Sequence, residues 1–444
     1  MTSKRWQGAA ASAAMATGLA LSSAPATAQS NDAQAALAAR LDQLAAELAA
    51  VKAELARLQQ QQAANAAPVA NVPATVPIAT VTASAAVAAQ GAGLVAEPTT
   101  VLTSYGEINY NRPTRDSKNA VSDVRRFVLG YQHRFDEKTK VVTELEVEHA
   151  VSSSSDPGEV EVEQAYIERQ LTSKVAARAG LFLMPFGLLN ENHEPTAFYG
   201  VERNFVETAI IPSTWREGGL QFVVGFDNGL AAQAGVTTGF DLGKWDATST
   251  KGAASPLGAI HQELALAKAR DLSVFGALNW RGVPGLLVGA SLFTGGATHG
   301  ETVASSRVTL WDLHARYTPG RWDLSSVYSR GTISNTPDFN TPLVGSQALI
   351  PKCFDGWYGQ AAYHLWSEGD YALAPFVRWE QFNTARSFAD LGAGLTPPAA
   401  RTERVITVGT NFNIGSSIVL KADYQRFREK TDNNRLDLGL GWSF

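Results

Sequence analysis

The chain has 444 residues, a formal net charge of −5 and a single cysteine. An acidic chain gives no support for nucleic-acid binding, and one cysteine excludes an internal disulfide. No run of about 18 apolar residues follows the N-terminal segment, which excludes a membrane span built from a hydrophobic helix.

The first 28 residues have the pattern of a secretory signal peptide. Lys4 and Arg5 form a charged start, a weakly hydrophobic stretch follows, and Ala26-Thr27-Ala28 matches an A-x-A cleavage site. A disordered alanine-rich tail is the alternative, but small residues at both cleavage positions favour the signal. We therefore predict a signal peptide at 1–28 and export of a mature chain that begins near Gln29.

Residues 29–62 carry a heptad pattern, and 63–98 form a linker rich in Ala and Pro. The apolar positions alternate in spacing between four and three: Leu37, Leu41, Leu44, Leu48, Val51, Leu55 and Leu58. This spacing places them on one seam of a coiled coil. A single amphipathic helix packed on its own domain is the alternative, but the linker offers it no surface. We predict an oligomerising periplasmic stalk whose number of chains the core residues do not fix.

From residue 99 onward, apolar and polar residues alternate as they do in β-strands. In SIVLKADYQRF, for example, Ile418 and Leu420 point to one side and Lys421 and Asp423 to the other. Segments of this kind are about nine to thirteen residues long, which suits tilted membrane-spanning strands. Sixteen are predicted: 101–110, 122–135, 139–150, 159–170, 174–183, 215–226, 229–238, 270–281, 285–294, 306–317, 321–331, 355–366, 370–382, 401–413, 417–428 and 433–444.

The connections between these segments alternate between short turns and mostly long loops. Turns such as FDNG and SEGD alternate with loops such as 184–214 and 239–269, the asymmetry of a barrel with tight periplasmic turns and long outer loops. A soluble β-sandwich is the alternative, but many full charges lie opposite the apolar faces, which suits a water-filled lumen. The expected fold is all-β: a 16-stranded antiparallel transmembrane β-barrel at 99–444, preceded by a short coiled-coil helix.

The loop after the fifth predicted strand has the most specific sequence. Residues 181–221 contain Pro185-Phe186-Gly187, then Glu194-Pro195, Tyr199 and Glu202-Arg203, and the return from Trp215 to Gly219. This pattern resembles the outer-membrane porins of the phosphate- and polyphosphate-selective (O and P) type. The resemblance implies a homotrimer of barrels in which the third loop folds inward and constricts the pore.

The third loop departs from the lysine-lined constriction of the phosphate-selective members. It contains no lysine, and its candidate constriction residues are Glu191, Glu194, Glu202, Arg203 and Glu207. We therefore expect a broad, weakly selective porin for ions and small hydrophilic solutes. An anion or phosphate preference is the finer expectation that the resemblance implies.

Charged residues on inward strand faces are the candidates for the pore lining: Arg126, Arg134, Arg178, Arg316, Arg378, Glu146, Glu148, Glu161 and Glu163. We expect Glu146 to lie opposite Glu163, and Glu148 opposite Glu161. Facing carboxylates repel, so Arg126, a divalent cation or water is expected to compensate. An acidic strip that acts in selectivity and a plain solvated lumen face both stay open. The five arginines, opposed to loop acids, would set a transverse field across the constriction.

Enzyme motifs are not found in the sequence. The seven histidines form no H-x-x-x-H or H-x-H cluster, and there is no G-x-S-x-G, P-loop or C-x-x-C. His193 with Glu191 and Glu194 is the one compact acid/base group. We expect no enzyme activity, no cofactor and no metal site.

The chain ends in LDLGLGWSF, an alternating segment that predicts the closing strand. Proteins that resemble this one end in an aromatic residue that the outer-membrane assembly machinery recognises, which assigns Phe444 to assembly. The expected location is the outer membrane of a Gram-negative bacterium, with that machinery, membrane lipid and small ions or solutes as partners. A sugar-specific channel and a structural or adhesive protein tethered by its coiled coil are the alternative functions.

Overall fold

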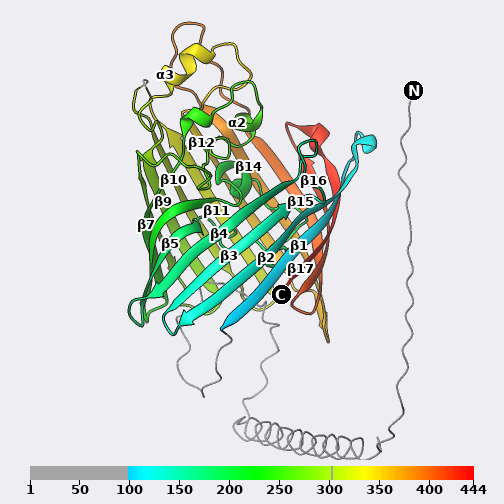
Figure 1. The fold of residues 1–444 in the computed structure, drawn as a ribbon. Helices are drawn as coiled ribbons and strands as arrows, with labels where there is room; N and C mark the ends of the chain where they lie inside the picture. Colours follow the sequence, from blue (N-terminus) through cyan, green and yellow to red (C-terminus); the bar gives the residue numbers. More distant parts are fainter. Residues whose placement is uncertain (1–98, 302–303) are drawn as a thin grey trace, which may run out of the picture. The chain divides into compact units, whose positions relative to one another are not determined.

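The computed structural model describes residues 99–301 and 304–444, which form one closed antiparallel β-barrel (Figure 1). The predicted signal peptide at 1–28, coiled coil at 29–62 and linker at 63–98 lie outside the described residues. Within the described ranges, no helix has the length and apolar character needed to cross a membrane.

Seventeen strand segments occupy sixteen positions in the barrel wall. β12 and β13 share one position, since both pair with β14 and only residues 364–365 separate them. β1 pairs with β17, so the sheet has no free edge. The prediction of a 16-stranded antiparallel barrel is confirmed. The strands are β1 (Thr100–Pro113), β2 (Val121–Asp136), β3 (Thr139–Glu148), β4 (Glu159–Gln170), β5 (Val175–Leu183), β6 (Arg216–Gly225), β7 (Leu230–Thr237), β8 (Ser273–Trp280), β9 (Leu286–Gly296), β10 (Arg307–Tyr317), β11 (Trp322–Ile333), β12 (Cys353–Tyr363), β13 (Trp366–Glu368), β14 (Tyr371–Ser387), β15 (Glu403–Ile414), β16 (Ile418–Phe427) and β17 (Arg435–Ser443).

The connections alternate between short turns at one end of the barrel and longer loops at the other. The longest loops are 184–215, 238–272 and 334–352. The helical segments all lie in loops: η1 (Ser117–Asn119), η2 (Pro195–Ala197), η3 (Val206–Ile210), η4 (Leu242–Lys244), α2 (Lys251–Ala254), α3 (Thr336–Asn340), η5 (Thr341–Leu343) and η6 (Thr431–Asn433). Residues 184–215 connect β5 to β6 and are called the third loop below.

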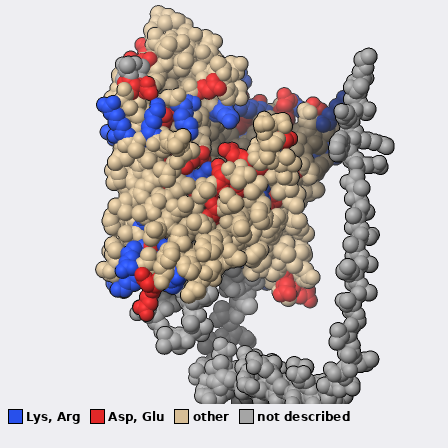
Figure 2. Space-filling view, viewed as in Figure 1, with Lys and Arg blue, Asp and Glu red and all other residues tan. Residues whose placement is uncertain are grey.

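The outer surface of the barrel is apolar. On β17, Leu436, Leu438 and Leu440 are 41%, 46% and 38% exposed, whereas Asp437 between them is fully buried inside. Figure 2 shows, on the left of the view, an uncharged band between charged zones above and below it, and a group of acidic side chains near the middle of the face. The apolar strand faces therefore point outward, as expected for a wall that contacts lipid.

Part of the barrel interior is apolar, whereas the sequence predicted a water-filled lumen lined by charges. Trp215 packs against Phe240 of the loop 238–272 and Phe293 of β9, with ring centroids 5.2 and 5.0 Å apart. The cluster continues onto inner-face residues of β10 and β11, among them Leu310 and Val327. Toward the long-loop end, two loops and the wall thus form a packed core in place of water.

Candidate functional site: the third loop inside the barrel

The third loop turns into the barrel and bonds to the inner wall. The backbone N–H of Val201 donates to Asp423 Oδ2 of β16 at 2.6 Å, and that of Phe205 donates to Glu380 Oε2 of β14 at 2.7 Å. Arg378 of β14 donates to the carbonyl oxygens of Tyr199 and Glu202 at 3.1 and 3.2 Å. Inward polar residues of the late strands therefore hold the second half of the loop.

His193 fixes the first half of the loop to the wall formed by β1, β2 and β4. Its Nε2 lies 2.8 Å from Glu163 Oε1, and its Nδ1 lies 3.0 Å from the carbonyl oxygen of Asn190. Tyr105 Oη of β1 also lies 2.7 Å from this Nε2, and the same hydroxyl donates a hydrogen bond to Glu163 Oε2 at 2.9 Å. Arg126 adds a hydrogen bond to the His193 carbonyl oxygen at 2.7 Å. His193 is thus an anchor of the loop, not part of an acid/base group with Glu191 and Glu194.

Glu207 is buried within the loop and organises it through hydrogen bonds. Its carboxylate accepts hydrogen bonds from Leu189 N at 2.8 Å, Asn204 Nδ2 at 2.8 Å and Tyr358 Oη at 3.1 Å. Burial raises the pKa of Glu207, while these hydrogen bonds lower it. Such a buried acceptor, surrounded by donors, holds together two segments of the loop and β12.

The candidate arginines of the wall pair mainly with acids of the wall. Arg126 bonds Glu107 at 2.8 Å, Arg178 bonds Glu168 at 2.7 Å, Arg316 bonds Asp323 at 2.6 Å and Arg378 bonds Glu380 at 3.1 Å. Arg134 lies at the short-turn end, where it donates to the Glu137 carbonyl oxygen at 3.5 Å. Arg178 also lies within electrostatic reach of the third-loop carboxylate of Glu191. A transverse field between the wall arginines and the loop acids therefore stays a prediction.

The predicted register between β3 and β4 is wrong by two residues. Glu146 lies opposite Glu161, and Glu148 lies opposite Glu159. A β-bulge in β4, which leaves Glu163 as an extra residue without a partner on β3, accounts for one residue of this difference. Glu163 lies beside His193 and accepts a hydrogen bond from Tyr105 Oη at 2.9 Å.

The inner face of β3 carries three carboxylates in succession. Among the described residues, Glu144, Glu146 and Glu148 form no ion pair; Glu144 accepts one hydrogen bond from Gln164. Arg203 of the third loop lies within electrostatic reach of Glu146, and burial lowers the pKa of Arg203 to about 10. This face of the interior is therefore acidic, with one loop arginine near it.

Three of the four remaining predicted acids have polar partners on the wall. Glu161 lies 2.5 Å from Arg216 Nη2, in the region where β4 no longer pairs with β5. Glu191 accepts from Gln233 Nε2 at 3.1 Å, and Glu202 accepts from Asn111 Nδ2 at 3.3 Å. The Glu194 side chain accepts no hydrogen bond from the described part of the chain. The loop acids thus face different sectors of the wall and do not form one cluster.

Several wall residues that hold the loop were not predicted. They include Tyr105, Asn411, Lys421 and Asp423, all buried and inward-facing. Strand alternation places such residues on the inner face, but it carries no signal for which of them meets a loop that is distant in sequence. Lys421 Nζ, for example, lies 3.4 Å from the ring centre of Phe198 in a cation–π contact.

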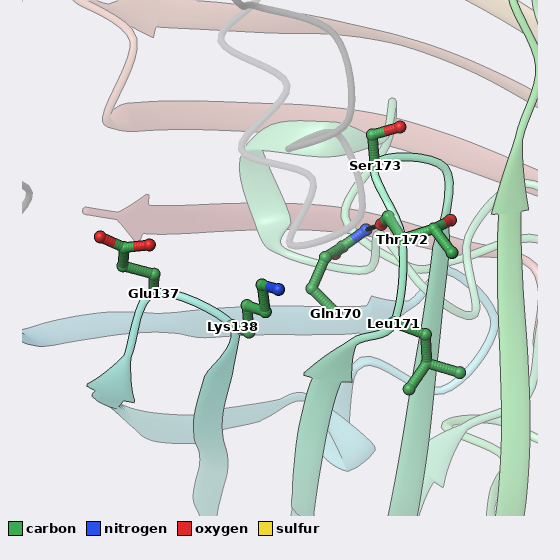
Figure 3. A pocket seen from close by; sticks show the side chains of 6 residues that line it. All are labelled: Glu137, Lys138, Gln170, Leu171, Thr172 and Ser173. Atoms are coloured by element: carbon green, nitrogen blue, oxygen red, sulfur yellow. Dashed lines mark hydrogen bonds between the residues drawn. The ribbon is translucent and has the colours of Figure 1, made fainter.

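A shallow hollow at the short-turn end is separate from this site. Figure 3 shows its lining between the β2–β3 and β4–β5 turns: Glu137, Lys138, Gln170, Leu171, Thr172 and Ser173. None of the predicted site residues lines it. Among the described residues, no group of three or more His, Cys, Asp or Glu is placed to hold a metal ion.

No protein-family model matches the chain. An uncharacterized protein of Aquifex aeolicus is 28% identical over 352 residues, which cover 77% of this chain and 79% of that protein. The structure of Salmonella typhi OmpF in complex with daunomycin is 14% identical with a TM-score of 0.54, over 78% of this chain and 97% of OmpF. The anion-selective porin of Comamonas acidovorans is 12% identical with a TM-score of 0.49, over 78% and 100% of the two chains. The described chain therefore has the β-barrel fold of OmpF, an outer-membrane porin.

Proposed function

We propose that the protein is an outer-membrane porin that lets ions and small hydrophilic solutes diffuse through a barrel constricted by its third loop. The observation that carries this proposal is the third loop itself, which bonds to inward-facing residues on both sides of a closed barrel. A loop held inside the barrel at that place narrows the passage through it. Its polar surroundings favour hydrated solutes over apolar ones.

The charges along the inner wall favour a weak preference for cations. Glu144, Glu146 and Glu148 lack ion-pair partners within the described residues, whereas most candidate arginines are paired. An anion or phosphate preference, which the family resemblance implies, draws support from Arg203 and Lys421 near the loop. The three carboxylates of β3 outnumber the two basic side chains Arg203 and Lys421. We therefore propose a preference for permeant cations over permeant anions.

We further propose a Gram-negative outer membrane as the location and a homotrimer as the assembly. The apolar outer band supports the first, since such a surface needs lipid around it. The predicted coiled coil at 29–62 supports the second, and the C-terminal Phe444 fits recognition by the assembly machinery.

A structural or adhesive role is the second candidate, and one observation favours it. The third loop and its wall partners are buried; Val201, for example, is 1% exposed and Asp423 is 3% exposed. A loop packed this closely would suit a barrel that conducts little. A sugar-specific channel has less support, because the inward aromatic residues Tyr105, Tyr166 and Tyr358 are buried and do not form an accessible track.

Planar-bilayer recording of the purified protein tests the proposal. We expect discrete conductance steps and, in a salt gradient, a reversal potential with the sign of a weak cation preference. Absence of conductance from a folded barrel would overturn the porin proposal and favour the structural role. A reversal potential of the opposite sign, with block by phosphate, would establish the anion preference.

A further inference from the structure

The inner face of β17 is unusually open at the level of the third loop. Gly439 and Gly441 point inward there, whereas the residues beside Gly439 are Lys421 on β16 and Asn109 on β1. Neither glycine has a positive φ, so the backbone conformation would accept any residue. Space, not conformational freedom, is therefore the reason for glycine at these two positions.

The third loop fills the space that the two glycines leave. A Cβ placed on Gly441 would overlap Pro195 Cβ and lie 2.8 Å from its Cγ, and a Cβ on Gly439 would lie 3.2 Å from Val201 Cγ1. Two residues further along β17, on the same face, Ser443 Oγ lies 2.8 Å from Thr196 Oγ1. We call Gly439, Gly441 and Ser443 the glycine seat, and each of its three residues meets its own residue of the loop.

The seat controls how closely the loop approaches the wall. Val201 and Pro195 are buried against it, and the backbone of Val201 bonds Asp423 at 2.6 Å on the neighbouring strand. A side chain in the seat would push the loop toward the barrel axis, while the bonds to β14 and β16 would keep it attached. Solutes can pass only through the part of the barrel interior that the loop leaves free. The distance between the loop and β17 at the glycine seat therefore sets the width of the passage.

We propose that the glycine seat on the closing strand is the positioning element that sets the cross-section of the pore. This inference rests on the proposed porin function, and it names the residues that determine its size limit. Gly441 matters most, since an added methyl group there meets a rigid proline ring. Gly439 acts in the same way with a more tolerant partner, because the Val201 methyl groups lie slightly further away.

Single-channel conductance of Gly441→Ala tests the inference. We expect unit conductance to fall about twofold, because pore diameter controls ion flow, and the exclusion limit for neutral solutes to fall with it. Gly359→Ala on β12 is the matched control, since a Cβ there meets only the Trp357 ring at 3.7 Å. The control should conduct as the wild type does.

A double-mutant cycle separates repositioning of the loop from general damage. Pro195→Gly removes the atoms that collide with the new methyl group, so Gly441→Ala combined with Pro195→Gly should recover the conductance of Pro195→Gly alone. Equal conductance of Gly441→Ala and wild type, or additive effects in the double variant, would overturn the inference.

A cross-link reports on the seat without requiring conduction. Thr196→Cys with Ser443→Cys, in a Cys353→Ser background, should form a disulfide on oxidation, and Gly441→Ala should slow its formation several-fold. If the wild type does not conduct but the cross-link behaves as described, the porin function fails and the loop-positioning part stands. If the cross-link does not form in a conducting, folded barrel, the glycine seat does not position the third loop, and the porin function stands.

Discussion

Glu207 is the residue on which the internal order of the third loop depends most directly. Its carboxylate accepts from Leu189, Asn204 and Tyr358, and loss of hydrogen bonds to a charged group costs about 1.5–3 kcal/mol each before relaxation. We expect Glu207→Ala to lower the free energy of unfolding by about 3 kcal/mol and to raise open-channel noise. Denaturant unfolding and bilayer recording measure the two effects. Glu194→Ala is the control, and equal behaviour of the two variants would refute this role.

The three carboxylates of β3 provide the second test at the scale of single residues. Because Glu144, Glu146 and Glu148 have no ion-pair partner within the described chain, replacing all three with Gln removes three acidic groups from this face without breaking a salt bridge. We expect the cation-to-anion permeability ratio to fall at least about twofold, measured as a reversal potential in a salt gradient. Glu137→Gln, on an exposed turn, should leave the ratio unchanged. An unaltered ratio in the triple variant would show that ions do not pass this face.

At the scale of the element, β17 combines closure of the barrel with support of the loop. Its outward leucines are exposed, its inward glycines lie against the loop, and its backbone pairs with β1. The chain continues this pairing through Phe444, whose N–H donates to Ser104 O at 2.9 Å and whose carbonyl oxygen accepts from Ser104 N at 3.0 Å. Phe444 is nevertheless 72% exposed.

Phe444→Ala should therefore separate assembly from stability. The substitution keeps both backbone hydrogen bonds with Ser104 and removes only an exposed side chain. The free energy of unfolding of the barrel should therefore change by less than about 0.5 kcal/mol. We expect the yield of folded protein in the outer membrane to fall several-fold while unit conductance stays the same. Quantitative heat-modifiability gels of outer-membrane fractions measure the yield. A normal yield would remove Phe444 from assembly.

At the scale of the whole molecule, the barrel is complete from Thr100 to Ser443 and closes through β1 and β17. A variant in which the signal peptide leads directly into Thr99 should thus keep the unit conductance of the wild type. If residues 29–62 form the predicted oligomerising stalk, the same variant should show fewer channels that insert in groups of three. Conductance-step statistics and chemical cross-linking test both parts, and an altered unit conductance would place residues before Thr99 in the pore.

The sequence predicts the wall well because strand alternation is a local property. The apolar faces around Leu436 and Leu420 and the position of most turns follow directly from it. The register at Glu163 does not, because a β-bulge adds one residue without changing the composition. The apolar cluster around Trp215 was also missed. Alternation puts Leu310 on the same face as Asp312 and Val327 on the same face as Asp323, but it does not show that distant loop residues pack against them.

The candidate site was predictable as a loop but not as a set of contacts. The third loop and its charged residues follow from the sequence, whereas the partners of His193, Glu207 and Val201 come from strands far along the chain. Such contacts depend on how the barrel closes, which no local pattern encodes. The sequence LDLGLGWSF contains both glycines, but the reason for glycine at 439 and 441 lies in their contacts with Val201 and Pro195 of the loop.

The contact between Thr196 and Ser443 joins residues that are 247 positions apart in the chain. Contacts of such high sequence separation form late, because the intervening chain must first be ordered. The contact of the loop with β17 can form only once the last strand is in place, so seating of the loop at this strand follows closure of the wall. If the protein is the porin proposed above, a barrel without this contact would have a wider passage, and restricted permeability would mark finished molecules.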